Sequence, residues 1–330
     1  MHSVQYINGE KLSKTIFVAI AAQDDEELKH TVRYIFDNAD NPKNISVGIA
    51  LTAIKRKSLK EAQALVKKYN VRLDFVKQKK NDRSMLGIGK GRLRAANLYQ
   101  DEDYMIQIDC HSFFDKSWDT TLLKLYKEAT KEVDSNIVLT AIPPVYEYCC
   151  NKHNDEPIKS GAQTRYAFYK TQEFFIDVVP SWSEVEVSLV RSEKFLPQAK
   201  LSPAFVMGSK NFAKNPGIHY EATFYDEDLT QSINLFDRGF AFVFPNVEDL
   251  PVRHLDSRGI VKGHTRFFLL DYLNQEEQDL LHDNLKKQYL KFVKNDANKS
   301  AIEKYKKYSK VDAVKGCFTN NKNLVPESFR

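Results

Sequence analysis

The strongest constraint on the fold is an alternation of short apolar runs with amphipathic segments between residues 15 and 109. The runs at residues 15–22 and 45–51 are continuous and typical of strands buried within a sheet, and the first is also rich in β-branched residues. The segments between the runs place apolar side chains at helical spacing, as Leu28, Val32 and Ile35 do. This alternation predicts a parallel sheet that binds a nucleotide at the carboxyl ends of its strands. The predicted strands are residues 15–22, 45–51, 71–76 and 104–109, and the predicted helices are residues 28–36, 59–69 and 92–99.

The rest of the chain continues the α/β pattern less regularly. Residues 145–200 carry many aromatic and polar residues without a clear period, and the tail from Glu276 onward is helical and rich in lysine. Asp24 or Asp25 is expected to cap the first helix. Further along we expect strands at 136–141 and 240–245, a helix at 228–238 closed by Gly239, and loops at 78–91 and 211–225.

Composition indicates a folded, water-soluble protein. Of the 330 residues, 42% are hydrophobic, which is enough for a sizeable core. The formal net charge of +5 is too mild to demand a polyanionic partner. The N-terminus lacks the pattern of a signal peptide, and no run approaches the ~20 apolar residues of a membrane span. These features predict a cytoplasmic protein with reduced cysteines and no membrane partner, in the host cytoplasm if the chain is virus-encoded.

Asp109 and His111 are the first candidate metal ligands, because an apolar strand runs directly into Asp109-Cys110-His111. Alternate residues of an extended chain point to the same side, so both side chains can converge on one cation at the sheet edge. A carboxylate oxygen with an imidazole nitrogen suits Mn²⁺ or a similar divalent ion. His254, after the last predicted strand, could complete a set of three. On spacing alone, incidental polar residues at a strand end and a surface histidine are the competing interpretation.

Two further segments carry candidate site residues. Glycines at the end of the loop 78–91 precede a helix and allow backbone N–H groups to approach a phosphate. Arg94 in that helix is a candidate for binding the same group, although a flexible surface loop is the competing interpretation. Tyr225-Asp226-Glu227-Asp228 stands where a helix begins, so its carboxylates either cap that helix or face a sugar or an acceptor hydroxyl.

Together these segments resemble the cytoplasmic polypeptide N-acetylglucosaminyltransferases that act on hydroxyproline. The likeness is sharpest at Ile106-Gln107-Ile108-Asp109-Cys110-His111, where the family reads Leu-Gln-Ile-Asp-Ser-His, with a Trp-Asp pair following in both. Cys110 therefore replaces the usual serine. The likeness spans residues 15–260, and its other segments are 16–21, 91–95, 139–146, 226–228, 239–240 and His254.

The resemblance implies a GT-A fold, which is an α/β Rossmann-like mixed sheet flanked by helices, here with a C-terminal helical extension. It also implies metal-dependent transfer of a hexosyl, pentosyl or N-acetylhexosaminyl group from a nucleotide sugar, expected to be a UDP-sugar, with retention at the anomeric carbon. Mn²⁺ or Mg²⁺ is the implied ion. The implied metal ligands are Asp109, His111 and His254, the donor-binding residues are Ala21, Gln23, Arg94 and Asp109, and the catalytic carboxylates are Glu227 and Asp228.

The order of these segments along the chain predicts a catalytic domain, residues 1–270, and a lysine-rich helical extension, residues 271–330. Within the catalytic domain, residues 15–120 are expected to bind the donor and residues 121–270 to form the acceptor side. Acceptor specificity is expected in variable loops such as residues 145–200.

The partners expected are a nucleotide-sugar donor and a macromolecular acceptor, and two interpretations of the acceptor stay open. One is a hydroxyl on a protein, and the other is a hydroxymethylated DNA base, as virus-encoded glycosyltransferases modify. The lysine-rich tail either grips phosphates and stacks on bases or packs its aromatic face on the core. A third interpretation is an inactive module that only binds nucleotide sugars. The relevant aromatic residues are Tyr289, Phe292, Tyr305 and Tyr308 in the tail, and Tyr166, Phe168, Tyr169 and Trp182 for a base pocket.

Overall fold

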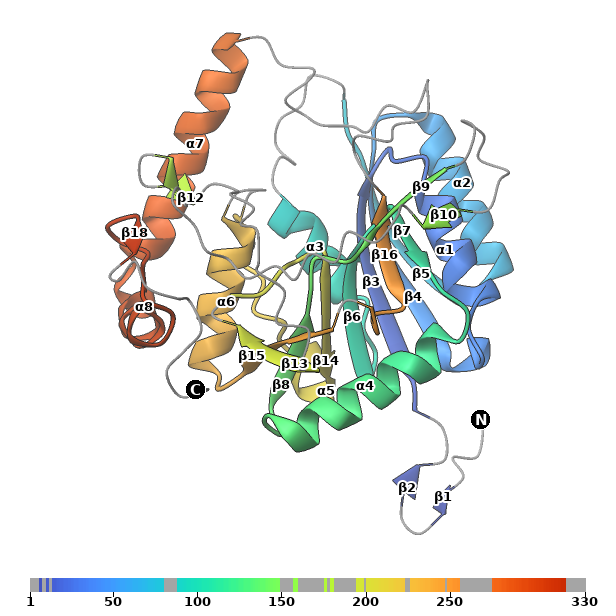
Figure 1. The fold of residues 1–330 in the computed structure, drawn as a ribbon. Coiled ribbons are helices and arrows are strands. Elements are labelled where there is room, and N and C mark those ends of the chain that lie inside the picture. The colour runs from blue at the N-terminus through green and yellow to red at the C-terminus, as the bar shows by residue number, and fades with distance from the viewer. Residues whose placement is uncertain are drawn as a thin grey trace.

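The centre of the protein is an eight-stranded mixed sheet with the strand order β13-β15-β8-β14-β6-β3-β4-β5 (Figure 1). This computed structural model describes residues 6–7, 10–11, 14–79, 88–148, 157–159, 175–176, 179–180, 194–198, 200–222, 226–246, 248–255 and 275–318. The strands are β3 (Ile16–Gln23), β4 (Ile45–Ala53), β5 (Val71–Lys77), β6 (Tyr104–Asp109), β8 (Ile137–Thr140), β13 (Phe195–Gln198), β14 (Phe205–Ser209) and β15 (Ala241–Pro245).

The strands predicted between residues 15 and 109 pair in parallel, as expected, and so do β8 and β15. β3 pairs in parallel with both β4 and β6, and β4 pairs in parallel with β5. The sheet becomes mixed because β14 lies antiparallel between β6 and β8, and β13 pairs antiparallel with β15. The mixed sheet implied by the family resemblance is therefore confirmed, whereas the sequence patterns alone predicted neither β13 nor β14.

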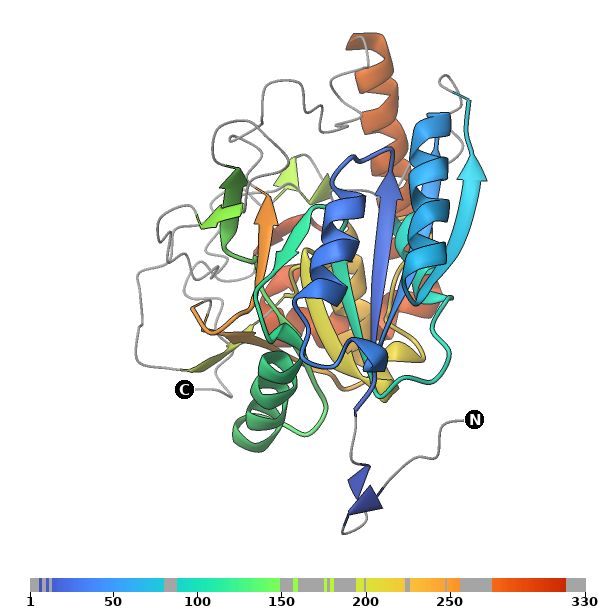
Figure 2. The same ribbon diagram turned by 90° about the vertical axis from the view of Figure 1, so that its right-hand side faces the viewer.

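Helices cover both faces of the sheet, and the alternation of side chains along β3 shows how. Ile16, Val18 and Ile20 belong to one buried cluster with α1, α2 and α4, while Phe17 and Ala19 belong to another with α3, α5, α6, α7 and α8. Figure 2 shows α1 and α2 in front of the sheet, with the red and orange C-terminal helices behind it. The helices are α1 (Leu28–Asp37), α2 (Arg56–Lys68), α3 (Ile88–Ala96), α4 (Trp118–Glu132), α5 (Lys210–Ala213), α6 (Glu227–Asp237), α7 (Gln275–Val293) and α8 (Asp296–Ser309).

Three local predictions were wrong. The loop predicted to reach residue 91 ends earlier, because α3 already begins at Ile88. Its Gly89 N–H donates to the carbonyl of Ala222 at 3.0 Å, and a Cβ at Gly89 would collide with the carbonyl oxygen of His219, so a glycine is required at this contact. The loop predicted at 211–225 contains most of α5. Neither Asp24 nor Asp25 caps α1, because the N-cap position falls on Glu27.

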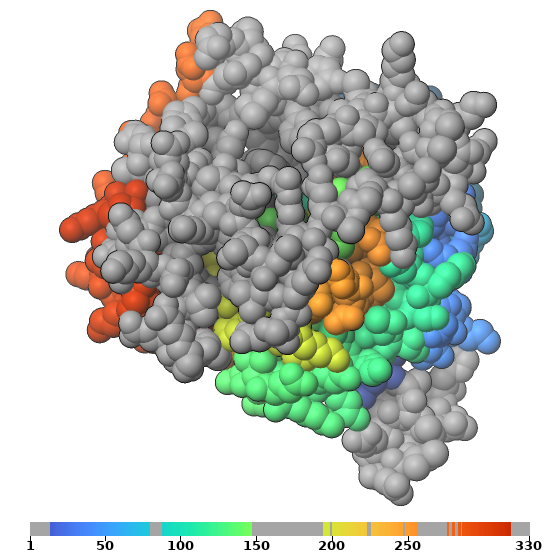
Figure 3. Space-filling model, viewed as in Figure 1, coloured from blue at the N-terminus to red at the C-terminus, as the bar shows by residue number. Residues whose placement is uncertain are grey.

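A small second sheet, with the order β10-β9-β16-β7, brings a late segment of the chain beside the end of β6. Its strands are β7 (Ser112–Phe114), β9 (Val145–Tyr148), β10 (Pro157–Lys159) and β16 (Val252–Leu255). β16 runs antiparallel to β7, with His254 opposite Ser112. In the space-filling view the orange surface of β16 borders the blue-green surface around β7 (Figure 3). The shorter elements are β1 (Tyr6–Ile7), β2 (Glu10–Lys11), β11 (Phe175–Ile176), β12 (Val179–Pro180), β17 (Val311–Asp312), β18 (Cys317–Phe318) and the 3₁₀ turn Pro42–Asn44.

The aromatic residues of the C-terminal helices pack on the core. Tyr289 and Tyr305 are fully buried, and the Tyr289 hydroxyl donates to the carbonyl of Ala313 at 2.7 Å. The Tyr308 ring stacks on Phe236, and its hydroxyl donates to the carbonyl of Gln198. The prediction of an amphipathic tail that packs its aromatic side chains on the core is confirmed, and the burial of Tyr289, Phe292 and Tyr305 leaves these three rings inaccessible to a base. The proposed base-pocket residues Tyr166, Phe168, Tyr169 and Trp182 lie outside the described residues.

The division into a catalytic domain and a C-terminal extension stays a prediction. α7 and α8 share a buried cluster with β3 and α6, so their side chains form part of the same core as the sheet. In the part of the chain that the structure describes, no helix is long and apolar enough to cross a bilayer.

Glu102 ties the start of β6 to its neighbours, and its replacement tests the acid stability of the sheet. Its carboxylate accepts hydrogen bonds from Arg72 and Ser46 and from the backbone of Gln100. Burial by itself would raise the pKa of Glu102, but these bonds lower it from 4.5 to about 2. Because the folded-state pKa lies below the ordinary value, the stabilisation is complete above about pH 4.5 and is lost as the pH falls toward 2.

Glu102→Gln is therefore expected to lower the free energy of unfolding at neutral pH by about 2 kcal/mol and to flatten its decline below pH 4.5. Urea unfolding across this pH range measures both effects. Glu61→Gln is the matched control, because Glu61 pairs with Lys29 at the surface and its loss is expected to cost no more than about 0.5 kcal/mol. Equal losses in the two variants would contradict the role assigned to Glu102.

Candidate active site

The turn from β6 to β7 carries the candidate metal ligands Asp109 and His111. The hydroxyl group of Thr31 in α1 lies 2.9 Å from the carbonyl oxygens of both Cys110 and Ser112, which share its hydrogen bond. The Ser112 hydroxyl in turn donates to the carbonyl of Asp109 at 2.9 Å. These bonds fix the backbone of the turn, so the side chains on it have a defined direction.

The structure brings Asp109, His111 and His254 together. Asp109 Oδ2 lies 3.1 Å from His254 Nε2 and 4.0 Å from His111 Nε2. The two Nε2 atoms are 2.9 Å apart. The backbone N–H of Leu255 donates to the carbonyl of His111, which ties β16 to the turn and holds His254 in place. One carboxylate oxygen and two imidazole nitrogens therefore converge on one point, which is a donor set suited to a divalent metal ion.

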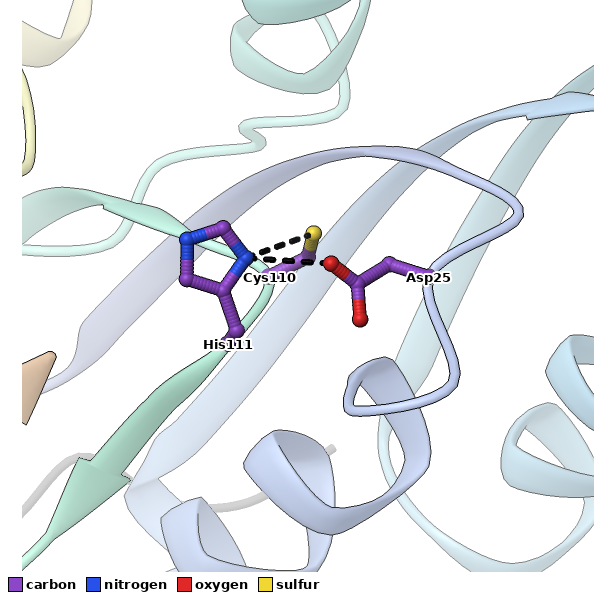
Figure 4. A group of neighbouring side chains, drawn as sticks. All are labelled: Asp25, Cys110 and His111. Carbon is purple, nitrogen blue, oxygen red and sulfur yellow. Dashed lines mark hydrogen bonds and ion pairs between the residues drawn. The ribbon is translucent and has the colours of Figure 1, made fainter. Parts of the chain in front are cut away.

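Asp25 orients His111 from the other side of the ring. Its Oδ2 lies 3.0 Å from His111 Nδ1 (Figure 4). Its Oδ1 accepts the backbone N–H of Glu27 at 2.8 Å. A hydrogen on Nδ1 that donates to Asp25 leaves the lone pair on Nε2, which faces Asp109 and His254. Burial by itself would raise the pKa of Asp25, but the hydrogen bond and charge of His111 lower it to about 2.

Arg92 is the cation of the site, although the sequence patterns did not single it out. It lies in α3 with its side chain only 4% exposed. Its Nε donates to Glu227 Oε2 at 2.8 Å, and one terminal nitrogen donates both to Glu227 Oε1 at 3.2 Å and to Asp109 Oδ1 at 3.0 Å. Arg92 therefore joins the predicted metal ligand Asp109 to the predicted carboxylate Glu227 by direct hydrogen bonds.

In this cluster the pKa values of Asp109 and Glu227 are shifted in opposite directions. Burial by itself would raise the pKa of Asp109, but Arg92 and the two histidines hold it well below its ordinary range. Burial raises the pKa of Glu227 to about 7, and the nearby Asp109 and Asp228 add to this rise while Arg92 opposes it. Asp109 is thus a carboxylate at any physiological pH, as a metal ligand must be.

Asp228 faces away from Arg92. It forms a buried ion pair with Lys200, which precedes β14, and its backbone carbonyl accepts from the Ser232 hydroxyl. Of the two predicted catalytic carboxylates, Glu227 is therefore the one in contact with the Arg92–Asp109 cluster.

The remaining predicted donor residues lie at the same sheet edge but at different distances from Asp109. Ala21 pairs directly with Asp109 across the β3–β6 ladder. Gln23 ends β3 and donates to the Gln78 side chain at 3.4 Å. Arg94 turns toward β4 and β5, where its Nε donates to Asp74 at 2.7 Å. Residues two apart on a helix point about 200° apart, so Arg92 and Arg94 cannot both face Asp109.

Helical spacing is the signal that could have identified Arg92. If the helix had been predicted to begin at Ile88 rather than Arg92, both arginines would have been placed inside it. Their spacing would then have shown that only one of them can face Asp109. Asp25 carries a weaker signal, because a polar residue just after a buried parallel strand is also typical of turns and caps.

The fold is GT-A, the architecture of a large class of glycosyltransferases. A crystal structure of GalNAc-T7 with UDP, GalNAc and Mn²⁺ is 16% identical, covers 75% of this chain and 45% of its own, and has a TM-score of 0.52. The mannosyltransferase PcManGT of Pyrobaculum calidifontis, in complex with GDP-Man and Mn²⁺, is 8% identical over 77% of this chain and 59% of its own, with a TM-score of 0.47. S. aureus TarS is 10% identical over 89% of this chain and 43% of its own, with a TM-score of 0.45.

The chain belongs to the glycosyltransferase (GlcNAc) family, whose model matches residues 15–84 and 55–309. This match does not separate the hydroxyproline-modifying enzymes from other members, so that narrower resemblance stays a prediction. The chain spans between 43% and 59% of the length of the solved structures named above. A search of curated proteins finds no match.

Proposed function

We propose that this protein transfers a sugar from a UDP-sugar to a hydroxyl group of a macromolecular acceptor, with retention at the anomeric carbon. The observation that carries the proposal is the convergence of Asp109, His111 and His254 beside the Arg92–Glu227 pair at the carboxyl edge of the parallel strands. That edge is where α/β sheets bind nucleotides. A solved relative in fold, GalNAc-T7, contains UDP and Mn²⁺.

In this proposal Asp109, His111 and His254 hold Mn²⁺ or Mg²⁺. When bound, the ion supplies positive charge that stabilises the departing nucleoside diphosphate. Asp25 fixes the tautomer of His111, so that Nε2 offers its lone pair to the ion. Ala21, Gln23 and Arg94 form the donor side of the sheet edge in this proposal, where Asp74 and Thr52 hold the guanidinium group of Arg94 beside β4 and β5.

Glu227 acts in this proposal through Arg92. Both of its carboxylate oxygens accept hydrogen bonds from the guanidinium group, which fixes the orientation of Arg92 against Asp109. A carboxylate engaged at both oxygens is poorly placed to attack the anomeric carbon itself, which supports attack by the acceptor on the face that the leaving group vacates. Asp228, paired with Lys200, supports the start of α6. NMR of the first-formed product tests for retention.

For the acceptor we favour a hydroxyl on a protein over a hydroxymethylated DNA base. The tail aromatics that suited base stacking are buried against α6 and β13, and the lysines Lys291 and Lys304 pair with Glu221 and Asp237. Transfer from a radiolabelled donor to a hydroxyproline peptide, compared with a hydroxymethylated oligonucleotide, distinguishes the two acceptors.

The test of the proposed function is donor hydrolysis together with a thermal shift. We expect Mn²⁺ with UDP-sugars to raise the melting temperature, because a ligand that binds only the native state stabilises it. We expect slow Mn²⁺-dependent hydrolysis of the same donor. A chain that binds the donor but never cleaves it would instead be the inactive nucleotide-sugar-binding module, and one that binds no nucleotide sugar would refute both alternatives.

A further inference from the structure

His111 offers its two ring nitrogens to two different groups of side chains. Nε2 faces Asp109 and His254, as described above, whereas Nδ1 faces Asp25 and the thiol of Cys110. The second group, Asp25, Cys110 and His111, also has one ligand atom from each residue within reach of a common point (Figure 4). It differs from the first group chemically, because it contains a sulfur.

The spacing of the second group fits a small tetrahedral ion. Ligand distances of about 2.0–2.3 Å around Zn²⁺ place neighbouring ligand atoms about 3.2–3.7 Å apart. His111 Nδ1 lies 3.0 Å from Asp25 Oδ2 and 3.7 Å from Cys110 Sγ. Asp25 and Cys110 also interact with each other directly. Only small side-chain adjustments separate this arrangement from three corners of a tetrahedron, and water supplies the fourth ligand in sites of this kind.

We propose that Asp25, Cys110 and His111 form a second cation site, selective for a soft divalent ion such as Zn²⁺, that competes with metal binding by Asp109, His111 and His254. Thiolate ligands favour Zn²⁺ over the hard ions Mg²⁺ and Mn²⁺. Cys110 is not in a disulfide, and its side chain is buried beside the partly exposed Asp25 and His111. The inferred competition rests on the proposed function, because it requires metal binding by Asp109, His111 and His254. The inferred Zn²⁺ site does not depend on the proposed function.

The competition follows from proton balance on one imidazole ring. Binding of Zn²⁺ releases the proton of the Cys110 thiol to solvent and takes the lone pair of His111 Nδ1. The proton that Nδ1 donated to Asp25 moves to Nε2 of the same ring. An Nε2–H has no lone pair for a second ion, so the set formed with Asp109 and His254 loses one of its three ligands.

Binding is tested with Cd²⁺ and Co²⁺ as probes of the thiolate, because both give a sulfur-to-metal charge-transfer absorption. The full chain contains Cys110, Cys149, Cys150 and Cys317, so the reference protein carries serine at the last three positions. We expect this reference to show the absorption at one equivalent of metal, and Cys110→Ser in the same background to lose it. A reference protein that binds Cd²⁺ or Co²⁺ without this band overturns the proposal, because Cys110 is its one remaining thiol.

Two histidine variants separate the two groups. Because His254 belongs only to the first group, His254→Ala is expected to keep the charge-transfer band. Because His111 belongs to both groups, His111→Ala is expected to weaken Cd²⁺ binding about 10-fold or more. Equal Cd²⁺ affinity in His111→Ala and the reference protein would overturn the assignment of Nδ1 as a ligand.

Competition is tested by adding Zn²⁺ to the Mn²⁺-dependent hydrolysis of the UDP-sugar. We expect Cys110→Ser to keep Mn²⁺-dependent turnover within about 3-fold of the reference, because Cys110 faces Asp25 rather than Asp109. The same variant is expected to need at least about 10-fold more Zn²⁺ for half inhibition. Equal Zn²⁺ sensitivity would overturn the competition. A reference protein without any turnover would instead refute the proposed function and leave the charge-transfer result to decide the site.

Discussion

Asp109→Asn is expected to reduce Mn²⁺-dependent turnover of the nucleotide-sugar donor about 1000-fold, because a metal ion contributes several kcal/mol of charge stabilisation and each 1.36 kcal/mol is a factor of ten. Asp109 Oδ2 is the one carboxylate oxygen in the group with His111 and His254, and Oδ1 also holds Arg92. The amide keeps the shape of the side chain but loses its charge. Steady-state hydrolysis and transfer assays at saturating donor measure the loss.

The control for Asp109→Asn is Asp249→Asn, which removes an exposed carboxylate near β16. We expect this control to keep its turnover and its melting temperature. Calorimetric titration with Mn²⁺ provides a second measurement, in which Asp109→Asn should lose most of its affinity. Full turnover of Asp109→Asn with added Mn²⁺ would remove Asp109 from the proposed mechanism.

Arg92→Ala is expected to cost about 3–5 kcal/mol of folding stability and to abolish turnover, since it leaves buried carboxylates without their counter-charge. Glu227 loses both of its hydrogen bonds from the guanidinium group, and Asp109 loses one. Arg92→Lys keeps the positive charge, but an ammonium group lacks the planar set of donors that binds Glu227 and Asp109 together. We therefore expect a smaller loss of stability than in Arg92→Ala, with a large loss of turnover. Urea unfolding and donor hydrolysis measure the two effects.

Arg94→Ala and Arg94→Lys are the matched controls, because Arg94 lies on the same helix and pairs with the more exposed Asp74. We expect the Arg94 variants to lose no more than about 1 kcal/mol of stability. If the Arg94 variants raise the KM for donor, the role predicted for Arg94 in donor binding is supported. If Arg92→Lys kept full turnover while Arg94→Lys lost it, the result would contradict the roles assigned to Arg92 and Arg94.

The fold was predictable from the sequence where strands and helices follow regular patterns of apolar residues. β3 and β4 are continuous runs of mostly apolar residues, β6 is mostly apolar, and β5 alternates apolar with charged residues, with helices of regular period between these strands. β14 was not predictable in this way, because its five residues Phe-Val-Met-Gly-Ser are too short to show a period. Its place between β6 and β8 depends on long-range pairing, which local patterns do not encode.

The candidate site was predictable to the extent that it lies at strand ends. Asp109 and His111 could be placed at the sheet edge because the apolar run before them is unmistakable. The approach of His254 depends on the pairing of β16 with β7, for which only the family resemblance offered a basis. Arg92 was missed because its role depends on which face of α3 meets the sheet, and that face follows from a helix start that the glycines obscured.

The position of β14 also bears on how the chain acquires its fold during synthesis. β6 and β8 emerge from the ribosome well before Phe205–Ser209, yet in the finished sheet they are joined only through that strand. Until then the nascent chain carries an unpaired apolar edge at β6, of the kind that promotes association with other chains. Completion of the Asp109 turn against β16 comes later still, so the sheet edge that carries Asp109 is complete only after Val252–Leu255 has been synthesised.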